Sequence, residues 1–428
     1  MGELANSWRG MCMRSLRTKL FVVIALTALS ACLSQVLATS PTQDLNVEVN
    51  CGAVGNGTTD DTASIQSCIN TAQTTGQGVY FPVGTYKITQ ALTISSGNML
   101  LYGTNGGTTK IVQFTAGDNV FTIANGGAPV NRVTLRHLQL EYSASGASGV
   151  TVYCDDCWRS RFEHLIFGDP GTPHLFSTGI WANGGNQVFV EDSEFDLTAS
   201  QGMYFTGTGD VYLTNLEVND DSSDTNTTGI VFDSGVGGIY ATNVNVTAGE
   251  TGFLFENSQT GGIPPKFGFF VNCLGDTVNG EGWDFESAES MRLTNSWAAT
   301  GNYGIILHNV NGISITDSRI YNNNEAGIWI EAGASNVSIK GSTISGNSRG
   351  SPGASPGVLV SAGVGQFQIL DNEIGEADGF GATQSYGVAI ASGASDDFMI
   401  VGNNLQNNVS GELSNGGTGS HVVIANNL

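Results

Sequence analysis

The sequence predicts an all-β fold, a single-stranded parallel β-helix (solenoid) with a capping helix at its N-terminal end. From about Asn131 to the C-terminus, the chain repeats a short apolar strand, a turn with Asn or Asp, a glycine and a second apolar strand. The period of roughly 20 to 30 residues is typical of a solenoid. Polar and apolar residues alternate within the strands, and helical periodicity is scarce, so each strand can pair only with its counterpart in the next coil.

The first strand of the repeat supplies an apolar core position and a polar turn position. The core positions are Leu135, Leu213, Leu293, Ile315, Ile339 and Ile369. The turn positions are His137, His164, Asp192, Asn215, Asn243, Asn272, Asn295, Asp317 and Asp371. We interpret the turn column, both histidines included, as a structural ladder between coils, because buried polar groups in turns need hydrogen-bonding partners.

The composition favours one long repeat domain over two or three globular ones. Of 428 residues, 59 are glycine and only 15 are Lys or Arg, a balance that suits turns and strands. The formal net charge of −23 argues against nucleic acid and anionic membranes as partners. It does not argue against a carbohydrate partner.

The first 38 residues have the features of an export signal. A basic segment, residues 14–19, precedes an apolar run, residues 20–29, and small residues follow. The run is too short to span a membrane. One interpretation is a bacterial lipobox that ends at Cys32, which would then carry a lipid anchor; cleavage after Ala38 is the alternative. We therefore expect a secreted, periplasmic or outer-membrane protein.

Five cysteines follow this leader. Cys51 and Cys68 could join the first strand to a following helix in an oxidising compartment. Cys154 and Cys157 form either a loop disulfide or two free thiols, since a lone pair without further Cys or His ligands does not favour zinc. Cys273 falls on an inward strand position and is predicted to lie in the core.

Residues 39–130 lack the regular repeat of residues 131–428 and include a helical pattern, which predicts an N-terminal cap and the first coils. A helix is expected over residues 60–73, with Asp60 as its cap. Its buried face would contain Ile65, Cys68, Ile69 and Ala72. Such a helix would cover the apolar interior and the open strand edges of the first coil.

Two segments of this cap carry a family resemblance. Residues 52–62 read GAVGNGTTDDT, Ile65 and Gln66 follow, and residues 79–88 read VYFPVGTYKI. These segments resemble the entry region of the pectate lyase superfamily, in particular its rhamnogalacturonase and epimerase-like group, which includes many phage tailspikes. The resemblance implies a right-handed parallel β-helix that acts on polysaccharide, as a monomer or a trimer.

Two subfamilies are disfavoured by missing motifs. The chain contains no Gly-His-Gly or Arg-Ile-Lys set, as polygalacturonases have, and no Asp-Pro-His-Glu, as alginate epimerases have; Asp169 and Pro170 stand without the rest. Because one fold supports many reactions, the family resemblance alone does not assign the chemistry.

The outward positions of the second strand give the strongest functional signal. Aligned on the glycine, the first outward column reads Thr151, Trp181, Tyr204, Val231, Leu254, Asp284, Ile306, Trp329 and Leu359. Two residues further on, the second column reads Tyr153, Asn183, Thr206, Asp233, Glu256, Glu286, His308, Glu331 and Ser361. The alignment thus predicts a strip of carboxylates with aromatic neighbours on one face of the solenoid.

Paired carboxylates suit the hydrolysis of glycosidic bonds. Strands stack about 4.8 Å apart, so Glu256 and Glu286 would lie about 5 Å apart, and Glu256 and Asp284 roughly 8 Å apart, separations suited to retention and inversion respectively. Stacked acids also raise one another's pKa. We predict Glu286 as general acid, Asp284 or Glu256 as base or nucleophile, and Asp233 as support. The predicted sugar contacts are Trp181, Tyr204, His308, Trp329 and Glu331.

Two other functions stay open. A polysaccharide lyase would need a base and a cation, such as Ca²⁺, to neutralise a uronate carboxylate; residues 219–224 form either a Ca²⁺ loop or a solvated turn. A non-catalytic glycan-binding or adhesive surface protein would bind without turnover. Hydrolysis requires no metal or other cofactor.

Overall fold

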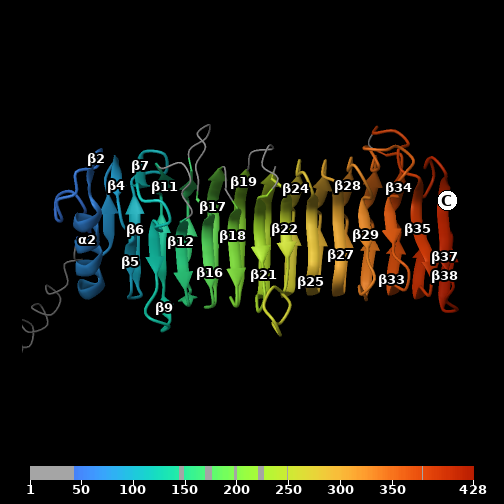
Figure 1. Ribbon diagram of the computed structural model, residues 1–428, viewed down its shortest axis with the longest axis horizontal. Helices are drawn as coiled ribbons and strands as arrows, with labels where there is room; N and C mark the ends of the chain where they lie inside the picture. The colour runs from blue at the N-terminus through green and yellow to red at the C-terminus, as the bar shows by residue number, and fades with distance from the viewer. Residues whose placement is uncertain are drawn as a thin grey trace, which may run out of the picture. The chain divides into compact units, whose positions relative to one another are not determined.

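The computed structural model describes residues 43–143, 149–168, 176–196, 200–219, 226–247, 249–377 and 379–428. Residues 45–428 form one compact unit, a solenoid of three parallel ladders of strands (Figure 1). The leader with Cys32, Asp169 with Pro170, and all of the acidic turn except Asn219 lie outside the described residues. No helix among the described residues is long and apolar enough to cross a membrane.

Ladder A contains the strands before the Asn turn, and ladder B contains those after it. The strands of ladder A are β1 (Leu45–Asn46), β3 (Val79–Phe81), β6 (Met99–Gly103), β10 (Val133–Arg136), β14 (Arg161–Glu163), β17 (Val188–Asp196), β19 (Val211–Asn219), β21 (Gly237–Thr247), β23 (Lys266–Val271), β25 (Glu281–Thr294), β27 (Tyr303–Thr316), β30 (Val337–Lys340), β33 (Gly365–Leu370), β36 (Asp396–Val401) and β38 (Val422–Ala425). Those of ladder B are β2 (Asn56–Asp60), β4 (Gly84–Ile88), β7 (Thr109–Gln113), β11 (Gln139–Tyr142), β15 (Ile166–Phe167), the ends of β17, β19 and β21, β24 (Leu274–Asp276), β26 (Trp297–Ala299), β28 (Arg319–Tyr321), β31 (Thr343–Ser345) and β34 (Glu373–Gly375).

Ladder C contains the strands that begin near the repeated glycine. They are β5 (Leu92–Ile94), β8 (Phe121–Ile123), β12 (Val150–Asp155), β16 (Thr178–Asn183), β18 (Gln201–Thr206), β20 (Thr228–Phe232), β22 (Thr251–Phe255), the starts of β25 and β27, β29 (Ile328–Ile330), β32 (Val358–Val360), β35 (Tyr386–Gly393) and β37 (Gly411–Gly417). The short strands β9 (Val130–Asn131) and β13 (Cys157–Trp158) pair separately. The predicted parallel β-solenoid is therefore confirmed.

The core is a set of side-chain stacks that run from coil to coil. The six core positions expected from the first strand are all buried, with at most 1% of each exposed. On ladder C, Phe232, Phe255 and Phe285 stack with centroid distances of 5.1 and 4.2 Å, and Phe253 stacks on Trp283 at 3.9 Å. These stacks form because equivalent inward residues lie about 4.8 Å apart on neighbouring parallel strands.

The turn column is a ladder, but an exposed one. The amides of Asn215, Asn243 and Asn272 each donate to the previous coil, to Asp192, Asn215 and Asn243. All nine residues have φ between 48° and 56°, a left-handed conformation in which Asn and Asp are enriched. Backbone conformation, rather than the burial that we inferred from the sequence, therefore explains why polar residues recur here.

A second polar ladder lies inside the C-terminal coils and was not anticipated. In this ladder, the backbone N–H of one residue donates to the side-chain oxygen of the equivalent residue in the next coil. The series is Cys273, Ser296, Ser318, Ser342, Asn372, Asn403 and Asn427. It occupies the position after the exposed turn, where the chain enters ladder B. The ladder satisfies backbone donors that would otherwise be buried without partners.

Replacing Asn372 with Ala should destabilise the protein by about 2–4 kcal/mol. The amide accepts from Ser342 N at 2.9 Å and donates to Ile339 O at 3.0 Å and to Asn403 Oδ1 at 2.9 Å. Chemical denaturation of the variant and of Asn336→Gly measures the effect; glycine is the control because Asn336 has φ 54°, where alanine would be strained. Asn336 is exposed, and its amide donates to Asn311 at 2.7 Å, so its loss should change stability by less than about 1 kcal/mol. Equal losses would contradict the importance of burial.

The helix α2 (Thr62–Thr75) starts two residues later than predicted. Asp60 still accepts from Thr62 N at 3.1 Å, while Asp61, at the N-cap position, turns its carboxylate to Val54 N and Gly55 N. The four expected apolar residues are buried, and the helix lies at the N-terminal end of the ladders, against β1, β3 and β5 (Figure 1).

The cysteines form two disulfides in the described part of the chain. Cys51 bonds to Cys68, so the possible link between the first coil and the helix is present. Cys154 bonds to Cys157, so the loop disulfide is the correct alternative for that pair. Cys273 is free and buried, as predicted. Disulfides of this kind persist in oxidising compartments.

Candidate active site on ladder C

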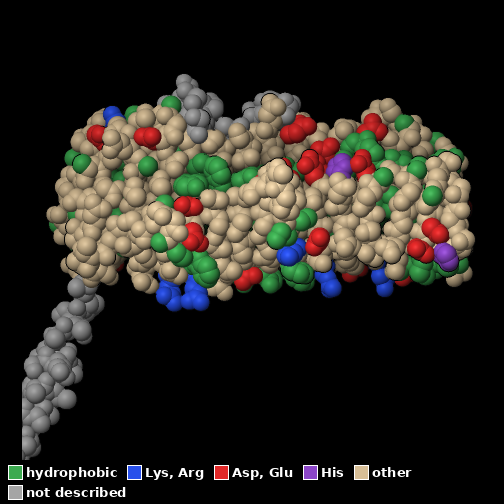
Figure 2. Space-filling model, turned by 60° about the horizontal axis from the view of Figure 1, so that its bottom comes forward, with side chains coloured by type: hydrophobic (Ala, Val, Ile, Leu, Met, Phe, Trp, Pro, Cys, Tyr) green, Lys and Arg blue, Asp and Glu red, His purple; other side chains and the backbone are tan. Residues whose placement is uncertain are grey.

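The outward columns of ladder C have the register predicted from the sequence from Trp181 onward. Trp181 pairs with Tyr204, and the same row continues through Val231, Leu254, Asp284, Ile306 and Trp329. The residues two positions later therefore also lie on successive coils. We call them, together with Asp284, the acid strip: Asp233, Glu256, Asp284, Glu286, His308 and Glu331. Figure 2 shows Asp and Glu side chains gathered around a histidine on the solenoid surface.

The predicted alignment is wrong in the coil before Trp181. There Tyr153, and not Thr151, pairs with Trp181, and Asp155 pairs with Asn183. Thr151 is buried. The error arose from Gly149, which lies two residues earlier in its strand than the corresponding glycines of later coils.

Asp233 differs most from its predicted environment. It was expected on a solvated strip, but it is fully buried, because its carboxylate is enclosed by five hydrogen bonds from Tyr204, Ser234 and Ser258. Burial raises the pKa of this carboxyl, but the hydrogen bonds outweigh it and leave the pKa below its ordinary value. Asp233 is therefore a buried anion that holds Tyr204.

Glu256 is the acid whose environment favours protonation near neutral pH. It lies one coil from Asp233 and one coil from Glu286. Burial, and then the charges of Asp233 and Glu286, raises the pKa of Glu256 to about 7. Glu286 is exposed; partial desolvation and then Asp284 raise its pKa, while His308 lowers it. Two neighbouring carboxyls thus differ in environment, an arrangement that can separate a proton donor from a carboxylate.

His308 bridges two acids of the strip. Its Nδ1 lies 2.7 Å from Glu331 Oε2, and its Nε2 lies 3.3 Å from Asp284 Oδ1. The hydrogen bond to Asp284 raises the pKa of His308 most. Burial lowers this pKa, but the hydrogen bond to Glu331 raises it further, and the result is a pKa of about 9. The imidazole is therefore a cation at neutral pH, and it holds both carboxylates in place.

The imidazole resonances of His308 should titrate with a midpoint near pH 9 in an NMR experiment. Because the folded pKa exceeds the unfolded value of about 6.5, the stability from this group is fully present below that value and is lost as the pH rises through about 9. Glu331→Gln should lower the midpoint, whereas the matched change at exposed Glu373 should not. A midpoint near 6.5 in the wild type would contradict the bridge.

Aromatic side chains lie on both sides of the acids. Tyr153, Trp181 and Tyr204 form an edge-to-face series with centroid distances of 5.4 Å at each step. On the other side, Trp329 lies 5.3 Å from Tyr303, and its Nε1 donates to Ser361. The predicted contacts Trp181, Tyr204 and Trp329 thus lie along the same face as the acids.

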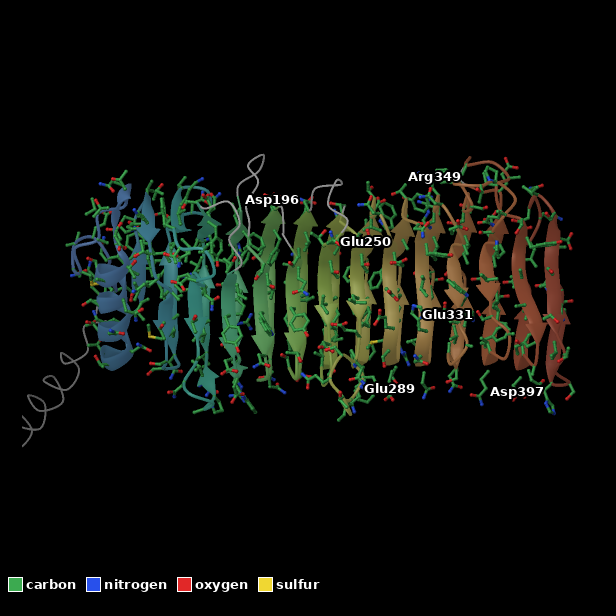
Figure 3. The ribbon with its side chains drawn as sticks, viewed as in Figure 1. Asp196, Glu250, Glu289, Glu331, Arg349 and Asp397 are labelled. Carbon is green, nitrogen blue, oxygen red and sulfur yellow. A yellow bond between two sulfur atoms is a disulfide. The ribbon has the colours of Figure 1, made fainter. Side chains whose placement is uncertain are left out.

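Two residues of the site were not among those predicted. Glu281 pairs with Tyr303 across neighbouring strands. Burial, and then Asp284 and Glu250, raises the pKa of Glu281 to about 7. Glu281 and Tyr303 each lie just before the repeated glycine, whereas the predicted columns contain only positions after it. Figure 3 labels Glu250 and Glu331, which lie in coils on either side of Glu281.

The acid strip does not form a compact metal site. Among the described residues, one group of three or more potential ligands has its donor atoms within 4.8 Å of one another, namely Asp396, Asp397 and His421. That group belongs to ladder A and the loop before β38, at the C-terminal end, where Figure 3 labels Asp397.

Comparisons with known proteins agree with this architecture. The chain resembles the mannuronan C-5 epimerase AlgE4 A-module of Azotobacter vinelandii at 18% identity and a TM-score of 0.56, over 89% of this chain and 100% of that one. It also resembles bacteriophage phi29 gene product 12, at 15% identity and a TM-score of 0.69, over 89% of this chain and 55% of that one. A third similar structure is the Agl-KA catalytic domain, at 17% identity and a TM-score of 0.52, over 90% of this chain and 69% of that one. These likenesses concern the fold. No curated protein matches the sequence.

Family models match two overlapping parts of the chain. Residues 241–428 match the right handed beta helix region. Residues 45–254 match the model described as rhamnogalacturonase A/epimerase, pectate lyase-like, which confirms the resemblance seen in the cap. The chain is therefore a right-handed parallel β-helix protein, and its residues 45–254 match the rhamnogalacturonase A/epimerase, pectate lyase-like family model.

Proposed function

We propose that this protein is an exported glycoside hydrolase that cleaves a polysaccharide lying along ladder C. The observation that carries the proposal is the pair of carboxyls on neighbouring strands, Glu256 with a pKa of about 7 and the more exposed Glu286. Glycoside hydrolysis requires a protonated acid and a carboxylate on either side of the scissile bond. The disulfides and the leader sequence support export.

The structure favours a different assignment of roles from the one predicted. We assign Glu256, rather than Glu286, as the proton donor, because its greater burial and the adjacent anions keep it protonated near neutral pH. Asp233 is enclosed and supports the site by raising the pKa of Glu256. Asp284 is paired with His308, which leaves Glu286 as the carboxylate that can reach a substrate.

The two glutamates can act in the sequence of a retaining hydrolase. Equivalent positions on neighbouring strands are about 4.8 Å apart, near the separation of about 5 Å that retention requires. Glu256 gives its proton to the glycosidic oxygen, while Glu286 attacks the anomeric carbon and forms a glycosyl ester. Water then attacks that ester, Glu256 takes the proton, and Glu286 leaves as a carboxylate.

The surroundings of the pair favour a neutral glycan. The two carboxylates Asp284 and Glu331 share the single positive charge of His308, so the surroundings keep a net negative charge, which would repel uronates. Trp181 and Trp329 offer apolar rings at the two ends of the strip. Fold relatives whose names specify carbohydrate chemistry, such as the mannuronan epimerase, are consistent with a polysaccharide substrate.

Product analysis on a polysaccharide panel tests the proposal. New reducing ends without ultraviolet-absorbing unsaturated products, lost in the Glu256→Gln variant, are the expected result. Unsaturated products would instead identify a lyase, whose uronate substrate would need a cation such as Ca²⁺. Glycan binding without turnover would identify the adhesive alternative. Sedimentation of the same preparation distinguishes a monomer from a trimer.

A further inference from the structure

A cavity of about 400 Å³ lies on ladder B, away from the acid strip. Its lining comes from five successive coils at the point where the chain leaves the exposed turn and enters ladder B, and Asn105 with Gly106 contributes a loop at one side. Figure 3 labels Asp196, which lies at the end of the same strand as its lining residue Glu194. The volume falls within the range of small-molecule sites.

The cavity has an apolar surface suited to a ring. Ile166 contributes a partly exposed aliphatic side chain, whereas the side chains of Leu165 and Leu216 belong to the buried core. His137 and His164 contribute two imidazoles, which meet edge to face with centroids 4.8 Å apart. Burial and then the neighbouring His164 hold the pKa of His137 below its ordinary value, so its ring is neutral at pH 7. Sugars present both apolar faces and hydroxyl groups, which match such a mixed surface.

The polar lining is negative and rich in hydrogen-bond acceptors. Asp192, Glu194 and Glu217 line the cavity, and its described lining includes no Lys or Arg. Glu194 and Glu217 are direct partners on neighbouring strands, an arrangement that costs stability unless a cation or donor compensates. The side-chain oxygen of Asn245, also in the lining, is buried without a hydrogen-bond partner.

The arrangement does not suit a metal ion. A bound cation requires three or more ligand atoms around one point, and no three His, Cys, Asp or Glu side chains of the described lining have their donor atoms within 4.8 Å of one another. The acids are instead spread around a space large enough for one sugar ring. An ammonium group on such a ring would supply the positive charge that the lining lacks, and its hydroxyls would donate to the carboxylate and amide oxygens.

We propose that this cavity is a second carbohydrate-binding site, separate from the acid strip, that binds one sugar ring carrying a free amino group. The ring would lie against Ile166 and the histidine pair, with its ammonium group between Glu194 and Glu217 and a hydroxyl donating to Asn245. The two histidines of the turn column, predicted to be structural, would thus also form one wall of a binding site.

Histidine NMR of the intact protein tests this site directly, because each site has its own reporter. Glucosamine should shift the imidazole resonances of His137 and His164 in a saturable manner, while His308 reports separately on the acid strip. Glucose and N-acetylglucosamine at equal concentration should produce at most about a tenth of the occupancy, since they lack the charge.

Matched variants decide the outcome. The double substitution Glu194→Gln and Glu217→Gln should weaken the glucosamine effect on His137 and His164 about tenfold or more, with the His308 resonance unchanged as evidence of folding. Glu373→Gln, elsewhere on ladder B, and Glu286→Gln, in the acid strip, should leave the glucosamine-induced shifts of His137 and His164 unchanged. The proposal is overturned if glucosamine leaves both histidines unshifted, if glucose acts equally, or if Ca²⁺ alone produces the shifts. Loss of polysaccharide cleavage alone would not affect it.

Discussion

Glu256→Gln should lower kcat/KM for polysaccharide cleavage by about 10²- to 10⁴-fold, the usual contribution of a general acid. The amide keeps the shape of the side chain but has no proton to give at neutral pH. Substrate binding should change little, because the aromatic contacts remain. Initial rates of reducing-end formation, together with binding measured on the inactive variant, separate the two effects.

The pH profile gives an independent check of the same residue. Cleavage requires protonated Glu256, so kcat/KM should fall as the pH rises through about 7. Glu289→Gln is the matched control, since Glu289 is exposed on the same strand β25 as Glu286, beyond the acid strip (Figure 3). Full activity of Glu256→Gln, or an equal loss in Glu289→Gln, would rule out Glu256 as the acid.

Asp233→Asn should have the second largest effect, on both stability and the site. We expect the free energy of unfolding to fall by about 3 kcal/mol, because five donors lose a buried anion. The pKa of Glu256 should fall below 7 but stay above its ordinary value, because burial, its largest cause, persists. The alkaline limb of the cleavage profile should therefore move to lower pH.

The stability difference should itself depend on pH. The folded pKa of Asp233 is below its unfolded value, so its contribution is present above about pH 4 and is lost as the pH falls through the folded pKa. Denaturation of wild type and variant at several pH values measures this. Asp317→Asn, at an exposed turn position, serves as the control. A constant difference down to pH 2 would indicate that Asp233 is not the buried anion described above.

The fold could be predicted from the sequence because its signal recurs in every coil. Leu135 and its equivalents repeat with the period of the solenoid, so errors in one coil are corrected by the next. This agreement between coils does not protect a coil whose marker residue is displaced. Aligning on Gly149 shifted the predicted strand of that coil by two residues. The internal ladder through Asn372 could not be predicted, because a buried Ser or Asn next to a turn resembles an ordinary turn residue in sequence.

The candidate site was predictable in register but not in environment. Strand pairing placed Glu256 beside Glu286, as alternation and period required. Burial depends on loops outside the strands, so the sequence did not reveal that Ser258, just beyond β22, covers Asp233. The pairing of His308 with Asp284 likewise depends on side-chain conformation, which the repeat pattern does not specify.

The coil-by-coil register of ladder C has an evolutionary consequence. Since each coil contributes one or two residues to the acid strip and pairs only with its two neighbours, duplication or loss of a whole coil would lengthen or shorten the strip without disturbing the remaining pairs. A gain of one residue within a strand, by contrast, would turn its outward side chains inward. Variation among descendants of such a chain should therefore occur in units of entire coils, with the length of bound glycan changing in the same steps.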